Sequence, residues 1–309
     1  MNHGYAPGKI ILLGEHSVVY GQPALAVPVD EISAHAIVAP ITAPDGSVRI
    51  HAPDIGLSAW LYDLTRDHPL GLIVRLTLQE LACDLPPFEI RISSTIPIAA
   101  GLGSGAAVSI AIVRAICRYA GKSLDRERQS QLAYEVERIY HGTPSGIDNT
   151  VIAYHQPVWF IRGEKPEPFS ITGQPGFVIA DTGIQVVTAE AVGRVRKLWE
   201  KNSNGFNVVF RQMGEIARRA RASLEQGDLA SLGSLMNENQ TLLAALGVSS
   251  PELERLLHAS REAGALGAKL SGAGLGGNII ALVEDDPAHL LSALSDAGAA
   301  TVLFTRIGS

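Results

Sequence analysis

Three glycine-containing segments, far apart in the chain, carry the polar residues that a phosphate-transfer site needs. They read Pro-Gly-Lys to Gly-Glu-His over residues 7–16, Gly-Leu-Gly-Ser-Gly-Ala-Ala over 101–107, and Lys-Leu-Ser-Gly-Ala-Gly over 269–274. Glycine lets a backbone approach phosphate closely, and a following helix offers unpaired N–H groups and a positive dipole end. Each segment alone is weak evidence, because glycine loops are more often ordinary turns. Together they predict a small-molecule kinase.

Composition narrows the class of protein. With 309 residues, 46% of them hydrophobic, the chain can bury a large core, which suggests two domains. The net charge of −6 argues against general binding to nucleic acid or anionic membranes. We expect no signal peptide at residues 1–5 and no membrane span, since no run of about 18 apolar residues occurs. Cys83 and Cys117 lack paired spacing, so we expect a cytoplasmic location.

The first half of the chain changes from strands to helices. Short apolar runs at 9–13, 24–29 and 32–38 predict strands, and strict alternation at 88–93 favours an antiparallel or mixed sheet. Helical spacing occurs at 70–81, at 104–119, and from the capping candidates 123–125 to about His141, before Gly142. Strands are predicted to return at 151–154 and 158–161.

The second half follows a glycine- and proline-rich stretch at 162–176, which is the best linker candidate. Strands are predicted at 177–180, 278–283 and 301–305, and helices around 188–200, 207–226, 229–245, 251–263 and 287–297. This pattern predicts an α+β domain of helices on a small sheet. We place the domain division between residues 170 and 171.

The 101–106 loop also matches the dinucleotide-binding fingerprint G-x-G-x-x-A, with Asp125 about 20 residues further on. That interpretation fails because residues 95–98 separate the loop from its strand, and because Asp125 lies between two helices. The P-loop and protein-kinase motifs are also missing from the sequence.

Three side chains are candidates for the chemistry, each with a plainer alternative. Asp148 could accept a hydroxyl proton or orient the hydroxyl, or it could simply cap a turn. Glu137, beside apolar helix positions, could hold Mg²⁺ between phosphates, or it could be a solvated partner of Arg138. Lys9 could attract a phosphate or stabilise an alkoxide, or it could be a surface lysine.

Five segments in order resemble the GHMP kinase superfamily, and within it the mevalonate kinases. They are residues 6–21, 101–107, 141–149, 239–249 and 269–274, so the resemblance covers nearly the whole chain. It implies a two-domain α+β fold, with a ribosomal-protein-like domain at 1–170 and a ferredoxin-like domain at 171–309. It implies ATP- and Mg²⁺-dependent phosphorylation of the 5-hydroxyl of mevalonate, in isoprenoid biosynthesis.

The resemblance also implies roles for individual residues. Asp148 would be the catalytic carboxylate, Lys9 its cationic neighbour and Glu137 a Mg²⁺ ligand. The phosphates would bind at Gly101, Leu102, Gly103, Ser104, Gly105 and Ala106. The mevalonate pocket would be lined by Glu15, His16, Thr182, Ser271, Gly272 and Ala273. We expect no nucleic-acid or membrane partner, and the family includes homodimers.

Two positions depart from the family pattern. The family usually has a serine at the position of Gly105, which serves as a metal ligand, so Ser104 or a water would take its place. Leu275 replaces a glycine of the third motif. Two other functions stay open at this point: the same catalysis on another acceptor, such as phosphomevalonate, and a non-catalytic sensor that binds ATP or substrate.

Overall fold

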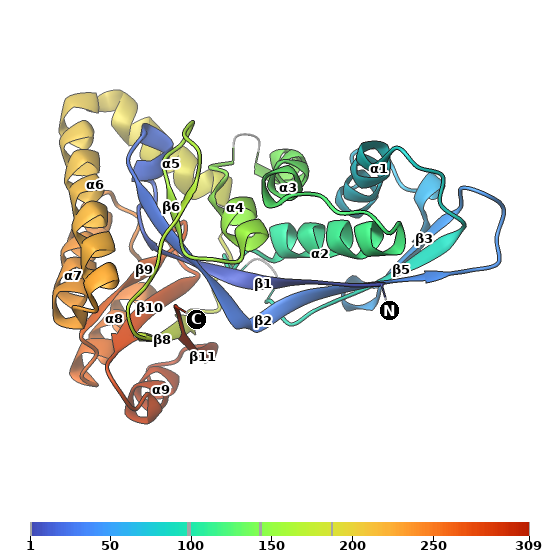
Figure 1. The fold of residues 1–309 in the computed structure, drawn as a ribbon. Coiled ribbons are helices and arrows are strands. Elements are labelled where there is room, and N and C mark those ends of the chain that lie inside the picture. Colours follow the sequence, from blue (N-terminus) through green and yellow to red (C-terminus); the bar gives the residue numbers. More distant parts are fainter. Residues whose placement is uncertain (1, 98–99, 142–143, 187, 309) are drawn as a thin grey trace. The chain divides into compact units, whose positions relative to one another are not determined.

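The computed structural model describes residues 2–97, 100–141, 144–186 and 188–308, with the backbone alone at 140 and 141 (Figure 1). The chain forms two compact units. Unit 1 takes in residues 1–8, 30–97 and 102–155, and unit 2 takes in 9–29, 98–101 and 156–309. Because the two N-terminal strands run from one unit into the other, the first motif groups with the C-terminal half. The linear division at residue 170 stays a prediction.

Unit 1 contains a mixed sheet. Its strand order is β4 (Leu57–Trp60), β3 (Val48–Ala52), β5 (Phe88–Ser94) and β2 (Ala24–Pro40), and β1 (Asn2–Leu13) pairs with β2. β3 runs parallel to β5, whereas β2 runs antiparallel to it. Phe88, Ile90 and Ile92 are buried and alternate with more exposed residues, as the sequence pattern at 88–93 predicts.

Four helices of unit 1 lie on one side of this sheet (Figure 1). They are α1 (Pro69–Leu81), α2 (Ser104–Tyr119), α3 (Arg126–His141) and α4 (Ile147–Tyr154). α2 is central, because it contacts β5 and the other three helices. The Arg128 amide donates to Asp125 Oδ1 over 2.7 Å, which confirms the predicted cap of α3. The predicted stop at Gly142 lies outside the described residues.

Unit 2 contains an antiparallel sheet of order β11 (Thr301–Arg306), β8 (Gly176–Asp181), β10 (Asn278–Val283) and β9 (Gly267–Ser271). The helices of this unit are α5 (Thr188–Lys201), α6 (Ser203–Gln226), α7 (Leu229–Ala245), α8 (Pro251–Glu262) and α9 (Ala288–Asp296). Along the chain, β8 is followed by the helices α5 to α8. The strands β9 and β10 then follow each other directly, and α9 separates β10 from β11. This is the β-α-β-β-α-β order of ferredoxin-like folds, so the α+β prediction is confirmed.

Two further strands of unit 2 are short. β6 (Val158–Phe160) pairs with residues 24–26 of β2 and with β7 (Glu167–Pro168). β7 lies within the glycine- and proline-rich stretch 162–176. Single turns of 3₁₀ helix occur at Ser17–Tyr20, Pro53–Ile55 and Leu61–Asp63.

Three secondary-structure predictions need correction. Residues 151–154 belong to α4 and not to a strand: this segment is buried on every side, so its apolar run carries no periodicity to identify a helix. The runs at 24–29 and 32–38 form one strand, β2, because the exposed Asp30 and Glu31 interrupt the apolar pattern without breaking the backbone. The strands β3, β4 and β9 were not predicted.

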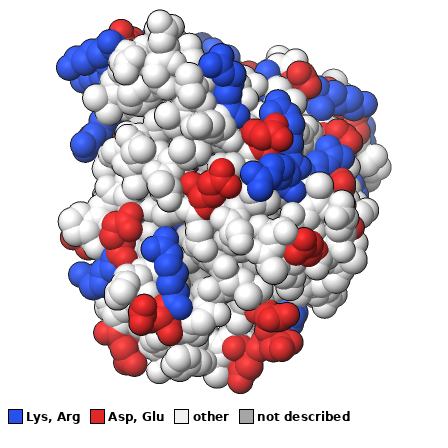
Figure 2. Space-filling model, turned by 90° about the vertical axis from the view of Figure 1, so that its left-hand side faces the viewer, with Lys and Arg blue, Asp and Glu red and all other residues white. Residues whose placement is uncertain are grey.

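The surface carries charges of both signs. Figure 2 shows Lys and Arg side chains interspersed with Asp and Glu on the face drawn, rather than a continuous basic area. Among the described residues, no helix is both long and apolar enough to cross a bilayer.

Candidate active site

The predicted site residues divide between the two units. Unit 1 holds the phosphate loop from Leu102 onward, together with Glu137 and Asp148. Unit 2 holds Lys9, the first glycine of that loop, Gly101, and the predicted substrate residues, which are Glu15, His16, Thr182, Ser271, Gly272 and Ala273.

In unit 1, the phosphate loop leads into the N-terminus of α2. Gly103 of this loop has φ +82°, and Gly101, which belongs to unit 2, has φ +74°; both are left-handed, a conformation that glycine adopts without strain. Gly103 is the N-cap residue, and no side chain caps this helix, whereas α1, α6, α7 and α8 each have a side-chain cap. The first amides of α2 are therefore suited to bind an anion from outside the helix.

Gly105, at the second position of α2, lies next to the Glu137 carboxylate of α3. A Cβ built on Gly105 would lie 2.9 Å from Glu137 Oε1, closer than side chains normally approach. The φ of Gly105 is not left-handed, so the helix itself does not require glycine here. We infer that glycine at this position makes room for the buried carboxylate, which is 7% exposed.

Asp148 lies in the first turn of α4 and is partly buried. Its neighbour Asn149 fixes this turn, because the Asn149 side-chain Nδ2 donates to the Ser130 carbonyl over 3.1 Å and to Ser130 Oγ over 2.8 Å. Ser130 and Glu137 are seven residues apart on α3, hence on one face of that helix. α3 therefore anchors the segment that bears Asp148 and also supplies Glu137.

In unit 2, a tight turn after β1 presents Glu15 and His16. His16 has φ +59° and ψ −49°, and the Ser17 amide donates to the Glu15 carbonyl over 2.6 Å, which defines a γ-turn of the rare, strained kind. Gly14, with φ +100°, could not carry a side chain, since its Cβ would lie 2.5 Å from the Ala24 Cα. Strain of this kind often occurs at functional sites.

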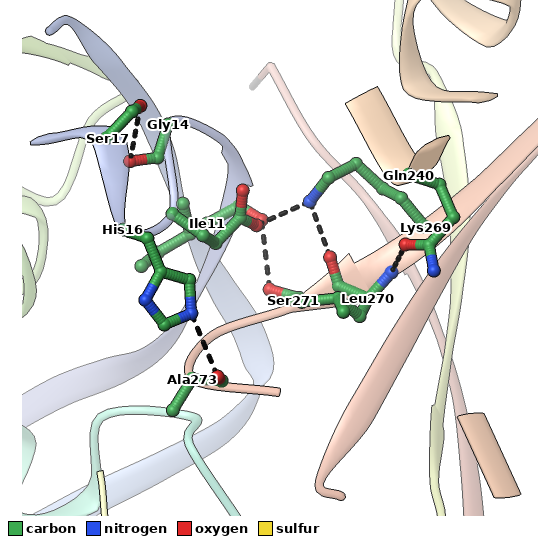
Figure 3. A network of polar contacts seen from close by, with 10 residues as sticks. Ile11, Gly14, His16, Ser17, Gln240, Lys269, Leu270, Ser271 and Ala273 are labelled. Atoms are coloured by element: carbon green, nitrogen blue, oxygen red, sulfur yellow. Dashed lines mark hydrogen bonds and ion pairs between the residues drawn. The ribbon is translucent and has the colours of Figure 1, made fainter. Parts of the chain in front are cut away.

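Glu15 forms an ion pair with Lys269 of β9 (Figure 3). Both side chains are almost fully buried, and the Lys269 Nζ donates to Glu15 Oε1. Burial raises the pKa of the Glu15 carboxyl, and the charges of Lys269 and Lys9 oppose that rise. Glu15 Oε2 has no hydrogen-bond partner among the described residues.

His16 is held in one tautomer by the third motif. Its Nε2 lies 2.9 Å from the Ala273 carbonyl oxygen and must donate the proton, since a carbonyl only accepts (Figure 3). Burial lowers the pKa of His16 to about 4, so the ring is neutral at physiological pH. Nδ1 is then an acceptor, and within the described chain it has no partner.

The other residues predicted to bind substrate lie at one end of the unit 2 sheet. Ser271 ends β9, and its hydroxyl donates to the Ile11 carbonyl over 2.9 Å. Asn278 opens β10 opposite both Ser271 and Asp181, and Thr182 follows Asp181 directly. The Thr182 amide donates to the Gly277 carbonyl over 2.9 Å, which joins Thr182 to the third-motif loop that also contains Gly272 and Ala273.

Sequence reasoning missed two residues of this site. Lys269 was part of a recognised motif, but nothing in its local sequence indicates a partner at residue 15. Asn278 is 2% exposed, and its Nδ2 donates to the Ala100 carbonyl, next to the first glycine of the phosphate loop. Its Oδ1 is buried without a partner in the residues described. A polar residue opening an otherwise apolar strand is the signal that could have found Asn278.

Leu275 adopts a left-handed backbone conformation, which glycine adopts without strain. Its φ is +63°, and its amide donates to the Val248 carbonyl over 2.6 Å. Replacing Leu275 with Gly is expected to stabilise the protein by about 0.5–1 kcal/mol, because it removes left-handed strain. Leu275→Ala keeps the Cβ and serves as the control. Urea unfolding should give the glycine variant a larger free energy of unfolding than the alanine variant. A smaller value for the glycine variant would contradict the strain argument.

Comparison with known proteins agrees with this geometry. The family profile of the GHMP kinases N terminal domain matches residues 70–156, and that of the GHMP kinases C terminal domain matches 220–300. A mevalonate kinase of Thermococcus sibiricus is 36% identical over 95% of this chain and 92% of its own length. The chain belongs to the mevalonate kinases of the GHMP kinase family.

Solved structures of the family show the same fold. A mevalonate kinase of L. major, crystallised in complex with R-mevalonate, superimposes with a TM-score of 0.85 at 29% identity, covering 100% of this chain and 96% of that one. A phosphomevalonate kinase of Streptococcus pneumoniae superimposes with a TM-score of 0.83 at 21% identity, covering 99% and 100% of the two chains. The second likeness concerns the fold alone, so the fold is compatible with different acceptors.

Proposed function

We propose that this GHMP kinase transfers the γ-phosphoryl group of ATP to the 5-hydroxyl of mevalonate, giving 5-phosphomevalonate and ADP. The observation that carries the proposal is the pair of buried acceptors without partners, Glu15 Oε2 and His16 Nδ1, in a chain of the mevalonate kinase family. A buried polar atom without a partner costs about 1–3 kcal/mol, which a bound ligand with hydroxyl donors would recover. Thr182, Ser271, Gly272 and Ala273 would complete the substrate pocket.

In the reaction, the 5-oxygen of mevalonate forms a bond to the γ-phosphorus while the bond to the bridging β–γ oxygen breaks, and ADP leaves with that electron pair. We propose that Asp148 either accepts the proton of the attacking hydroxyl or orients that hydroxyl. Lys9 would stabilise the negative charge on the attacking oxygen. The loop from Gly101 to Ala106 would bind the phosphates through its amides.

We propose that Glu137 is a ligand of Mg²⁺ and that Ser104 is a second candidate ligand. The residues fit this ion: a buried carboxylate is a hard oxygen donor, and the space kept open at Gly105 brings it to the N-terminus of α2. In the part of the chain described, no group of three or more His, Cys, Asp or Glu side chains could hold a metal alone. Mg²⁺ is typically held by one or two carboxylates plus phosphates and waters, and when bound it neutralises charge on the transferring phosphates.

Replacing Gly105 with Ala is expected to weaken metal binding while stabilising the helix. The new Cβ would displace the Glu137 carboxylate, so we expect the affinity of the protein–ADP complex for Mn²⁺ to fall about tenfold. Helix propensity favours alanine over glycine by up to about 1 kcal/mol. Electron paramagnetic resonance of free Mn²⁺ measures the affinity, and urea unfolding measures the stability. In Gly105→Ser the hydroxyl is a potential ligand and should recover part of the loss; an unchanged affinity in Gly105→Ala would refute this view of Gly105.

The proposed function is tested by ADP release from Mg-ATP with mevalonate, phosphomevalonate, homoserine and galactose as acceptors, and by phosphorus NMR of the product. We expect release with mevalonate and a primary phosphate ester. A preference for phosphomevalonate or an unrelated alcohol would keep the catalysis and change the acceptor. ATP binding without turnover on any acceptor would favour a sensor. A cytoplasmic location and a homodimer remain predictions that fractionation and light scattering would check.

A further inference from the structure

A buried ion pair joins the first and third motifs within unit 2 (Figure 3). The Glu15 side chain is 1% exposed and the Lys269 side chain is fully buried. The Lys269 Nζ donates to Glu15 Oε1 and to the carbonyl of the next residue, Leu270. Glu15 Oε2 takes no part in the pair, and no other described atom is its partner. The pair thus engages one carboxylate oxygen and leaves the other available.

The stability of the fold does not explain this pair. Removing two charges from water costs several kcal/mol for each ion, and well-packed apolar side chains in place of a buried pair are often at least as stable. β9 is already held on one side by β10. On the α7 side, Gln240 Oε1 accepts from the Leu270 amide over 3.0 Å and Asn237 Oδ1 accepts from the Ala268 amide over 3.1 Å. The reason for a lysine here is therefore its effect on Glu15.

We propose that Lys269 is a positioning residue for substrate binding, which holds Glu15 by Oε1 and so presents Oε2 as an acceptor for a substrate hydroxyl. The inference rests on the proposed function, since it concerns the same pocket. The hydrogen bonds described for Lys269 Nζ go to two protein oxygens, Glu15 Oε1 and the Leu270 carbonyl. Lys269 therefore acts on the substrate only through Glu15. A carboxylate with one oxygen fixed has a defined direction for the other, which a freely rotating carboxylate lacks.

The charge of Lys269 also decides the protonation state of Glu15. The groups that influence this carboxyl are Lys269 from β9 and Lys9 from β1, beside the neutral His16. Burial raises the pKa of Glu15, and Lys269 is the strongest of the charges that oppose the rise. Burial also lowers the pKa of Lys269, which Glu15 opposes. Without Lys269 the pKa of Glu15 would rise further, and the carboxyl would ionise only at higher pH.

The test compares Lys269→Met with Asn237→Ala, which removes a hydrogen bond to the same strand without touching Glu15. For Lys269→Met we expect the KM for mevalonate to rise about tenfold, with kcat and the KM for ATP nearly unchanged. The acidic limb of kcat/KM should move to higher pH, because Glu15 must ionise to accept from the substrate. Asn237→Ala should lower the melting temperature and leave both the KM for mevalonate and the pH profile as in the wild type.

A Lys269→Met enzyme with the wild-type KM for mevalonate and the wild-type pH profile would overturn the inference, whatever its stability. A second comparison uses the single variant Glu15→Gln and the double variant Glu15→Gln/Lys269→Met. The double variant removes both charges of the pair, so it leaves no buried charge without its partner. The two should have equal KM values, because Lys269 acts on the substrate only through the Glu15 carboxylate, which both variants lack. A further rise of about tenfold in the double variant would overturn the inference. This pair decides the question if Lys269→Met alone does not fold.

These outcomes differ from a failure of the proposed function. If the wild-type protein releases no ADP with mevalonate, the assigned acceptor is wrong, and the same four variants are compared with whichever acceptor it does phosphorylate. The inference fails there too if Lys269→Met changes neither the KM for that acceptor nor the pH profile.

Discussion

Replacing Asp148 with Asn is expected to lower kcat about 10²–10⁴-fold and to leave ATP binding unchanged. Asparagine has the same shape but cannot take up the hydroxyl proton. The turn that bears residue 148 should keep its place, because Asn149 is bonded to Ser130 and Ile147 is 1% exposed. Steady-state kinetics with mevalonate and calorimetric titration with ATP measure the two quantities.

The matched control for this variant is Asp84→Asn, which makes the same chemical change at an exposed position of unit 1. It should have the kcat of the wild type. If Asp148→Asn retained a near wild-type kcat, the role assigned to Asp148 would be wrong. The size of the loss also bears on the mechanism, because a loose phosphoryl-transfer transition state requires little early proton abstraction, so a loss near the lower end favours orientation over proton transfer.

Acidification is expected to destabilise the fold through His16. Its pKa is about 4 when folded and 6.5 in the unfolded chain. A lowered folded pKa contributes stability that is fully present above the unfolded pKa and is lost as pH falls through the folded one. At about 1.4 kcal/mol for each pH unit between 6.5 and about 4, the full loss amounts to about 3.5 kcal/mol. The cause is burial, because a protonated ring would be a desolvated cation near Lys269.

The comparison with His16→Asn isolates this contribution. Asparagine does not titrate, and it tolerates a positive φ better than most residues. Urea unfolding of both proteins at about pH 7 and about pH 4.5 gives the free energies, and the advantage of the wild type should shrink as the pH falls. Glu15 acts in the opposite direction, because its raised pKa favours the folded state when it is protonated, but it is present in both proteins. A pH-independent difference between the two proteins would contradict the burial argument.

Much of the fold could be predicted because its signals are local. The bounds of α2 and β10 follow from runs of residues whose periodicity or apolar character is visible within one segment. The predictions failed where burial removed the pattern, as in α4, and where two exposed acids interrupted a continuous strand, as in β2. β9 was missed because Gly267, Lys269 and Ser271 interrupt the apolar run that would identify a buried strand, although all of its residues are buried.

The sequence by itself determined the family, the order of the motifs and the residue types to which we assign the chemistry. It also supplied glycine at positions 101 and 103, where the backbone is left-handed and glycine adopts that conformation without strain. The tertiary structure alone decided the partners: Lys269 meets Glu15 across 254 residues, and Gly105 keeps its space for Glu137. The physical reason is that a side-chain contact between distant segments depends on how strands and helices pack. No local pattern records that packing, nor which buried oxygen or nitrogen it leaves without a partner.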